Sequence, residues 1–199
     1  MQKLILATRN PGKVKEIRAI LHSLPIEIIS LLDTVDLPEV AEDGTTLESN
    51  ALKKAGEIFH ATGIPSLADD SGLEVYALGM RPGVVSARYA GEHVTYEANN
   101  QKLLHEMKDL SQDRREARFR SVIAFVAHDV EKISEGICSG TIIAETRGRG
   151  GFGYDPLFVP DGYDKTFAEL SLEVKNRISH RAKALQTMKF VLEDYFPKA

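Results

Sequence analysis

Hydrophobic and polar positions along this chain predict strands and helices in alternation. A short continuous apolar run at residues 4–7 has the length of a buried strand, and residues 26–30 are a second strand candidate. Between them, Asn10 and Pro11 supply the N-cap and the first-turn proline of a helix. The apolar residues of this helix recur at helical spacing: Val14, Ile17, Ile20 and Leu21. The chain therefore opens with a strand, a loop and a helix.

The same pattern continues to the end of the chain. An acidic loop at residues 33–43 precedes a second helix, in which Thr45 and Glu48 match a capping box. The later segments predict a helix, an antiparallel pair of strands and a last helix, at residues 96–107, 117–127 with 133–144, and 179–196. No repeat, low-complexity tract or linker interrupts them, so the pattern predicts a single α/β domain.

Two adjacent carboxylates stand in the run Ala68-Asp69-Asp70-Ser71-Gly72-Leu73. Strands are predicted on either side, at 65–68 and 73–77, so the pair should lie in a bend at a strand end. Adjacent acids repel each other, and a divalent cation, an attacking water or both would compensate them. The alternative is an ordinary tight turn, because Asp, Ser and Gly are all turn formers.

Residues 8–13, Thr8-Arg9-Asn10-Pro11-Gly12-Lys13, join the first strand to the first helix. Unpaired N–H groups at a helix start, together with Lys13, favour an anion such as phosphate. The alternative is a capped helix with a surface lysine. The spacing of a P-loop is absent.

The segment 148–156 places four glycines beside two aromatic residues. Glycine lets a flat ligand approach the backbone, and an aromatic ring held there can stack on a nucleobase. A flexible hairpin loop is the alternative. The apolar run that follows it, Pro156-Leu157-Phe158, favours an ordered binding loop.

Positive side chains gather at residues 175–181, before and at the start of the last predicted helix. The helix dipole disfavours cations there, so His180 and Arg181 make best sense beside an anion or an acidic group. A solvated basic face is the alternative. Lys54 and Arg88 are further cations, but each alone is weak evidence for a binding site.

The composition of the chain narrows the range of possible partners and cellular locations. The chain has 199 residues, of which 43% are hydrophobic, enough for a sizeable core. Its formal net charge of -4 gives no basic footprint, so neither nucleic acid nor a membrane is expected as a partner. Cys138 is the only cysteine, which suits a reducing cytosol. The first apolar run is too short for a signal peptide or a membrane span, so we expect a cytoplasmic protein.

These segments together resemble one family, the inosine/xanthosine triphosphate pyrophosphatases. The motifs that carry the resemblance follow one another in this order: Thr8-x-Asn10-x-Gly12-Lys13, Asn50-Ala51-x-x-Lys54-Ala55, Ala68-Asp69-Asp70-Ser71-Gly72-Leu73, Pro82-Gly83-x-x-Ser86-Ala87-Arg88-Tyr89, Gly151-Phe152-Gly153-Tyr154-Asp155-Pro156 and Ser179-His180-Arg181. Each motif is short, but the ordered set covers nearly the whole chain.

The resemblance implies a mixed α/β fold with an elongated central sheet, flanking helices and two lobes around a nucleotide cleft, all within residues 1–199. It implies a homodimer that hydrolyses ITP, dITP and XTP to the monophosphate and pyrophosphate. The implied cofactor is Mg²⁺, at one or more ions per subunit, with Mn²⁺ as a substitute.

The resemblance also implies roles for individual residues. Asp70 would be the general base and a metal ligand, with Asp69 and Glu42 as further metal ligands. Asp43 and Glu48 are rivals for the place of Glu42. The phosphate contacts implied are Thr8, Arg9, Asn10, Pro11, Gly12, Lys13, Lys54 and Ser71. The residues implied on the base-binding side are Phe152, Gly153, Tyr154, Asp155, Lys175, His180 and Arg181.

Other functional classes stay open. A module that binds nucleotides without cleaving them would have no use for three acids. A phosphatase with an aspartyl nucleophile usually carries an Asp-x-Asp run rather than an adjacent pair. A related pyrophosphatase that prefers modified pyrimidine nucleotides is the closer rival.

Overall fold

The computed structural model describes residues 2–34, 37 and 40–197. Asp36 and Glu39, two acids of the predicted acidic loop, lie outside the described residues. The strands of the described chain are β1 (Gln2–Leu6), β2 (Ile26–Ser30), β3 (Ser66–Val75), β4 (Arg81–Pro82), β5 (Glu116–Ala127), β6 (Val130–Ile142) and β7 (Phe158–Pro160). Its helices are α1 (Pro11–Leu21), α2 (Leu47–Thr62), α3 (Tyr96–Glu106), α4 (Leu172–Ile178) and α5 (His180–Tyr195). Three short 3-10 helices complete the set: η1 (Tyr76–Leu78), η2 (Gly83–Arg88) and η3 (Gln112–Arg114).

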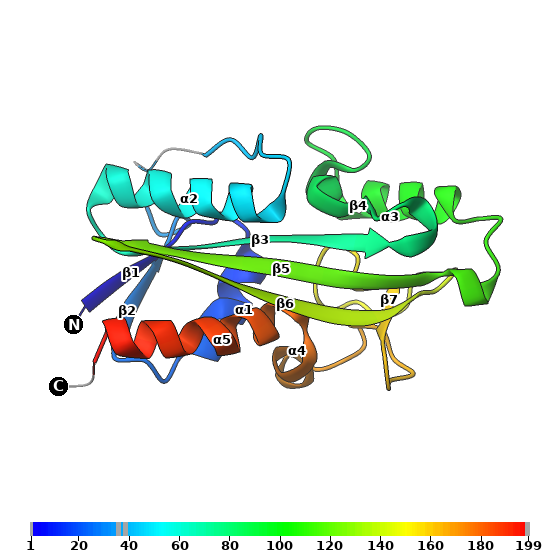
Figure 1. Cartoon of the computed structure of the whole chain (residues 1–199). Helices are drawn as coiled ribbons and strands as arrows, with labels where there is room; N and C mark the ends of the chain where they lie inside the picture. Colours follow the sequence, from blue (N-terminus) through cyan, green and yellow to red (C-terminus); the bar gives the residue numbers. More distant parts are fainter. Residues whose placement is uncertain (1, 35–36, 38–39, 198–199) are drawn as a thin grey trace. The chain divides into compact units, whose positions relative to one another are not determined.

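In this part of the chain the strands form one mixed sheet in the order β2-β1-β3-β5-β6-β7, with β4 paired to β3 (Figure 1). β1 runs parallel to both β2 and β3, and β4 and β7 run antiparallel to their partners. Parallel neighbours need a crossover connection, which α1 and α2 provide. The predicted mixed α/β fold with flanking helices is confirmed.

The described chain divides into two compact units, each built from separate stretches of sequence. Unit 1 comprises the described residues of Met1–Asp70, Ser121–Gly136 and His180–Ala199. Unit 2 comprises Ser71–Arg120 and Ile137–Ser179. β3, β5 and β6 contribute residues to both units.

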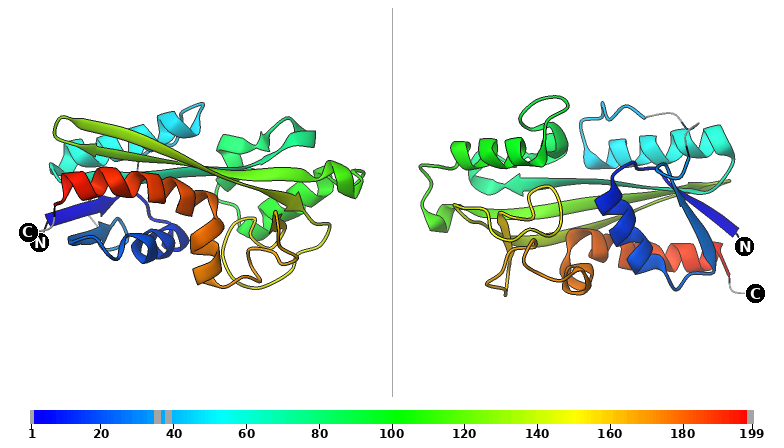
Figure 2. Two further views of the ribbon diagram at one scale, coloured as in Figure 1. Left: turned by 60° about the horizontal axis from the view of Figure 1, so that its bottom comes forward. Right: turned by 180° about the vertical axis from the view of Figure 1, so that it is seen from behind.

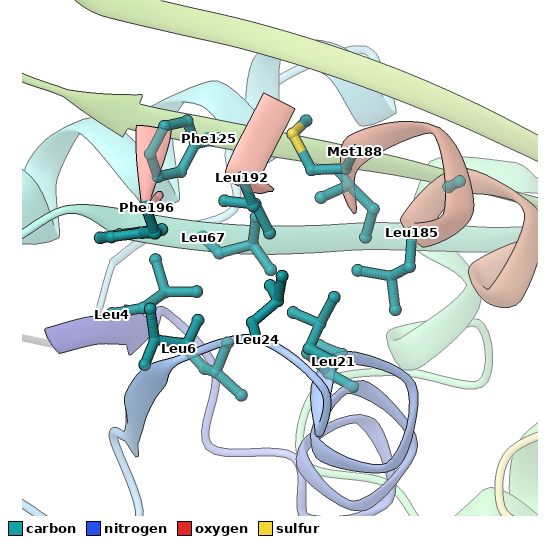
Figure 3. Close-up of a cluster of buried hydrophobic side chains, with 14 of the residues drawn as sticks. Leu4, Leu6, Leu21, Leu24, Leu67, Phe125, Leu185, Met188, Leu192 and Phe196 are labelled. Carbon is teal, nitrogen blue, oxygen red and sulfur yellow. The ribbon is translucent and has the colours of Figure 1, made fainter. Parts of the chain in front are cut away.

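Unit 1 has its helices on both faces of the sheet. α1 and α5 contact each other on one face, and α2 covers the opposite face (Figures 1 and 2). The apolar side chains between α1, α5 and the strands form a core that includes Leu6, Leu21, Phe125 and Leu192 (Figure 3). This core fixes the start of α1 and the start of α5 against the middle of the sheet.

Unit 2 has its own core, which contains several aromatic rings. Phe158 packs 4.8 Å from Phe119 and 5.1 Å from Phe167, measured between ring centroids. Cys138 and Tyr154 are buried in the same cluster. α3 lies on one face of this part of the sheet, and α4 lies on the other (Figure 2).

Two local predictions were wrong. Asp69 and Asp70 do not lie in a bend or a turn, because β3 continues through both of them. Gly72, which follows in the same strand, lies close to the start of η2. A Cβ on Gly72 would be 2.3 Å from the carbonyl oxygen of Gly83. The cap of α2 is Thr46 with Ser49, one residue beyond the predicted start, because these two side chains and backbone N–H groups satisfy each other.

The end of the chain also differs from the prediction. The predicted last helix begins at 179, whereas the structure has an additional helix, α4, which ends at Ile178. Ser179 has extended backbone angles and separates α4 from α5. The start of α5 is therefore fixed at His180. None of the described helices is long and apolar enough to cross a membrane.

Candidate active site

Asp69 and Asp70 are neighbours in β3 but have different partners. Successive side chains of a strand point to opposite faces of the sheet. Asp69 is paired with cations from α1 and α5, and Asp70 is paired with a cation from α2. The repulsion between adjacent acids is thus relieved by two separate sets of positive charge, which explains how both fit inside a strand.

The Asp69 carboxylate is saturated with donors. Arg181 donates from Nε to Oδ2 at 2.9 Å and from Nη2 to Oδ1 at 3.2 Å. The Lys13 Nζ lies 2.7 Å from Oδ1, and the Ser121 hydroxyl donates to Oδ2 at 2.8 Å. Burial disfavours the charge, but Arg181 and Lys13 outweigh it and hold the pKa of Asp69 well below its usual range. These cations therefore favour the ionised form of Asp69.

Arg181 is itself fully buried and contacts two acids. Its guanidinium donates to Glu16 of α1 as well as to Asp69. Burial would lower the pKa of Arg181, but the carboxylates of Asp69 and Glu16 raise it instead. The prediction that an acidic group lies beside this helix-start cation is confirmed.

The Asp70 carboxylate has a different environment. Its Oδ1 accepts a hydrogen bond from Lys54 Nζ at 2.8 Å. Its Oδ2 is buried and has no hydrogen-bond partner among the described residues. Burial raises the pKa of Asp70, against the opposing effect of Lys54 and Lys13. An oxygen left with free lone pairs is suited to hold a water molecule or a cation.

Lys54 joins Asp70 to the acidic loop. Its Nζ lies 2.8 Å from Asp70, 2.6 Å from Glu42 Oε1 and 2.9 Å from the carbonyl oxygen of Asp69. Burial opposes its charge, but the coulombic effect of Asp70 and Glu42 raises the pKa of Lys54. Of the three rivals for this place, Glu42 is the acid that pairs with Lys54. Asp43 instead pairs with Lys53, 2.6 Å away.

The backbone of the Glu42 loop is tied to α2. The Gly44 N–H donates to the side-chain oxygen of the buried Asn50 at 2.8 Å. A Cβ on Gly44 would lie 2.5 Å from that oxygen, so glycine is required there. Asn50 and Lys54 are four residues apart in α2, so they share a face of the helix. This face contacts the backbone of the loop through Asn50 and the Glu42 carboxylate through Lys54.

The start of α1 matches the predicted capped helix. The Asn10 side chain accepts a hydrogen bond from the Lys13 N–H at 3.1 Å, and Pro11 occupies the first turn. The Thr8 hydroxyl accepts from the Asn10 N–H at 3.2 Å. Arg9 donates to the carbonyl oxygens of Leu31 and Leu37, at 2.7 Å and 2.9 Å, so it supports the loop that follows β2. These contacts direct Lys13, and not Arg9, toward the aspartates.

A second arrangement, in unit 2, is the loop at residues 151–155. The Asp155 Oδ2 accepts a hydrogen bond from the Phe152 N–H at 2.8 Å and contacts Lys175 Nζ at 2.5 Å. Lys175 Nζ also lies 4.8 Å from the centre of the Phe152 ring. A Cβ on Gly151, whose φ is +71°, would lie 2.0 Å from the Asp155 carboxylate. The predicted ordered loop is confirmed, and Phe152 stays half-buried at its tip.

The predicted base-binding residues fall in both units. Phe152, Gly153, Tyr154, Asp155 and Lys175 belong to unit 2, whereas His180 and Arg181 belong to unit 1. Arg181 contacts Asp69, so its place is with the acid pair. The grouping of His180 and Arg181 with the base side stays a prediction. Ser71, predicted to contact phosphate, follows Asp70 in β3 but belongs to unit 2.

The three predicted metal ligands do not form one cluster. No group of three His, Cys, Asp or Glu side chains within the described ranges is arranged to hold a metal ion. Asp69 is paired with Lys13, Arg181 and Ser121, and its role as a metal ligand stays a prediction. Asp70 and Glu42 are the other two, and two carboxylates together with substrate phosphates make a common Mg²⁺ site. The unpartnered Oδ2 of Asp70 fits this donor set.

Sequence reasoning missed two residues of this cluster. Glu16 and Ser121 both contact the Arg181 and Asp69 pair. Glu16 follows Lys13 by three residues, a spacing that places both on one helix face, and this was the available signal. Ser121 has no sequence signal, because only the sheet order brings β5 to Asp69.

The described chain thus combines a mixed α/β sheet with a buried carboxylate centre in which two adjacent aspartates are paired differently. The chain belongs to the Ham1 family, which matches residues 4–191. A dITP/XTP pyrophosphatase of Geobacter sulfurreducens is 51% identical over 190 residues, 95% of this chain and 96% of that protein. One from Desulforamulus reducens is 52% identical over 92% of each chain.

Solved structures are similar along almost the whole chain. A HAM1 protein from Coxiella burnetii is 38% identical, with a TM-score of 0.87, over 98% of this chain and 100% of that one. A nucleoside-triphosphatase, also named dITP/XTP pyrophosphatase, from Mycobacterium abscessus is 44% identical, with a TM-score of 0.75, over 94% and 98% of the two chains.

Proposed function

We propose that this protein is a nucleoside-triphosphate pyrophosphatase. It hydrolyses dITP, ITP and XTP to the monophosphate and pyrophosphate, which removes these purines before they enter DNA or RNA. The observation that carries the proposal is the division of the aspartate pair, in which Asp69 is saturated with donors and Asp70 keeps a buried, unpartnered oxygen. Membership of the Ham1 family, with relatives named dITP/XTP pyrophosphatase, supports the choice of substrates.

Asp70 acts as the general base in this proposal. Its Oδ2 accepts a proton from a water molecule as the water oxygen forms a bond to phosphorus. The anhydride bond between the α- and β-phosphates breaks, and pyrophosphate leaves with the bonding electron pair. Without a bound cation, burial raises the pKa of Asp70 against the opposing effect of Lys54 and Lys13.

Asp70 and Glu42 would hold Mg²⁺, or Mn²⁺ as a substitute. The ion supplies neutralisation of the charge that develops on the phosphate oxygens. Lys54, which lies between the two carboxylates, keeps them 2.8 Å and 2.6 Å from one positive charge. This prevents the acids from separating by mutual repulsion, so the donor set is preorganised.

Residues 8–13 supply the phosphate contacts of unit 1. Lys13 and the N–H groups at the start of α1 stabilise negative charge through the ammonium and the positive end of the helix dipole. Lys13 already lies 2.7 Å from Asp69, so its ammonium is held near the acid pair. Ser71 is the further phosphate contact that the family resemblance implies.

The loop at residues 151–155 supplies the base contacts of unit 2. The half-buried Phe152 ring offers a surface on which a purine can stack. Lys175 is a donor suited to the keto group at purine position 6, where adenine carries an amino group. A buried donor that faced an amino group would lose its partner, so such a site rejects adenine nucleotides.

We further propose that the enzyme works as a homodimer in the cytoplasm, as the family resemblance implies. Light scattering coupled to size-exclusion chromatography measures the mass in solution. A mass of one chain at the concentrations used in activity assays would contradict the dimer.

Product identity and substrate choice test the activity. Purified protein with Mg²⁺ is incubated with dITP, XTP, ATP and dTTP, and pyrophosphate and orthophosphate are measured separately. Pyrophosphate from dITP and XTP, with little from ATP or dTTP, is the expected result. Orthophosphate as the first product, or no turnover of any purine, contradicts the proposal. Faster release from a modified pyrimidine nucleotide would establish the rival specificity.

A further inference from the structure

Two adjacent asparagines in α3 contact two different segments of unit 2. Asn99 accepts a hydrogen bond from the Ala90 N–H at 2.7 Å and donates to the carbonyl oxygen of Ala87 at 3.0 Å. Asn100 donates from Nδ2 to the carbonyl oxygen of Gly153 at 3.1 Å. Both side chains are buried. The helix therefore holds the end of η2 and the residues that follow it with Asn99, and the loop at residues 151–155 with Asn100.

The two amides differ in how completely they are satisfied. Asn99 uses its donor and its acceptor on the backbone. The Oδ1 of Asn100 is buried and has no hydrogen-bond partner among the described residues. A buried acceptor without a partner destabilises the fold. A Leu at this position would remove the unpaired acceptor but would also leave the Gly153 carbonyl without its donor, so the amide of Asn100 is the group that connects α3 to the loop.

The contact of Asn100 falls next to the residue that matters for stacking. Gly153 has a φ of +62°, and its carbonyl follows the Phe152 ring directly in the chain. Tyr96, four residues before Asn100 on the same face of α3, lies 6.2 Å from the Phe152 ring. The Tyr154 hydroxyl fixes the other side of the loop by donating to the carbonyl oxygen of Ser86 at 2.9 Å. Asn100 thus supplies a polar anchor at Gly153, the residue that follows Phe152.

We propose that Asn100 is a positioning residue for nucleobase binding, acting through the Gly153 carbonyl on the orientation of Phe152. The inference rests on the proposed function, because it assumes that Phe152 stacks on the purine. Asn99 is the matched comparison: it is buried, adjacent and chemically identical, but it is a fully satisfied structural residue.

The test compares Asn100→Leu with Asn99→Leu in the full chain, and Gln101→Ala, an exposed neighbour in α3, is the neutral control. Steady-state release of pyrophosphate from dITP gives kcat and KM, and thermal unfolding gives Tm. For Asn100→Leu, KM should rise about threefold to tenfold, as expected for one lost hydrogen bond, with kcat nearly unchanged. Its Tm should fall less than that of Asn99→Leu, which loses two satisfied hydrogen bonds.

Product inhibition separates base binding from phosphate binding. Inhibition by IMP should weaken in Asn100→Leu by the same factor as KM, and inhibition by pyrophosphate, which has no base, should not change. If Asn100→Leu does not fold, Asn100→Asp keeps the size and turns an oxygen toward the Gly153 carbonyl, so it should raise KM at least as much.

One result overturns the inference. A wild-type KM and wild-type inhibition by IMP in the Asn100 variant would mean that the residue is only structural. Failure of the proposed function is a separate result, since the wild-type protein itself would then release no pyrophosphate from dITP.

Discussion

Each unit of this protein has a buried lysine paired with an aspartate, and the two pairs are used differently. In unit 2, one oxygen of Asp155 is shared between Lys175 and the Phe152 N–H. In unit 1, Asp70 pairs with Lys54 through one oxygen, and its other oxygen is buried without a partner in the described structure. The first pair shapes a loop, whereas the second keeps bonding capacity available for a water molecule or an ion. The two pairs thus differ in the unused oxygen and not in the ion pair, and the proposed function assigns the reaction to the residue that has this oxygen.

The largest effect on this difference between the two pairs is expected for the variant Asp70→Asn. Loss of the base should lower kcat by about 10²–10⁴-fold, measured as pyrophosphate release from dITP. The fold should persist, because Asn has the same size and can still contact Lys54. Asp43→Asn, which alters an exposed acid paired with Lys53, is the control and should keep normal activity. Retained activity in Asp70→Asn would mean that another residue is the base.

The second-largest effect is expected for Arg181, the cation that donates to both oxygens of Asp69. Arg181→Met should lower the free energy of unfolding by about 3–5 kcal/mol, because Asp69 and Glu16 remain buried with less compensation. Denaturant unfolding measures this loss. Arg177→Met, at an exposed position of α4, should be within about 0.5 kcal/mol of the wild type. Equal stabilities for the two variants would show that the buried network contributes little.

The two aspartates should also have opposite effects on the pH dependence of stability. The lowered pKa of Asp69 means that its contribution is present above the unfolded value, about 3.9, and is lost as pH falls through the folded-state pKa. The raised pKa of Asp70 means that its contribution is present below that value and is lost as pH rises through its folded-state pKa.

Unfolding curves between about pH 2.5 and 7 check these signs. Relative to the wild type, Asp69→Asn should flatten the acid loss of stability, and Asp70→Asn should remove a loss that occurs as pH rises above about 3.9. Parallel curves for all three proteins would contradict the opposite assignments.

The smallest effect is expected at the tip of the unit 2 loop. Phe152→Leu keeps an apolar side chain but removes the flat ring, so stacking on the purine should weaken by about 1–3 kcal/mol. The KM for dITP should rise by about tenfold with little change in Tm, because Phe152 is only half-buried. A KM equal to that of the wild type would place the base elsewhere.

Local signals predicted much of this structure. The N-cap of α1 at Asn10 and the strand at Ile26–Ser30 follow from residues that are close together in sequence. The bend at Asp69 and Asp70 was predicted wrongly for the same reason. Two adjacent acids with Ser and Gly favour a turn locally, and cations from distant segments, among them Arg181, which is 112 residues away from Asp69, compensate both charges within the strand.

The sequence by itself determined the family, the alternation of strands and helices, and the residue types of both sites, because motif order and hydrophobic period are properties of the chain. The tertiary structure decided which aspartate is saturated and which keeps a free oxygen. It also brought Glu16 and Ser121 to Asp69, and tied Asn100 to Gly153. Burial and the pairing of distant charges depend on which elements meet, and neither can be read from local sequence.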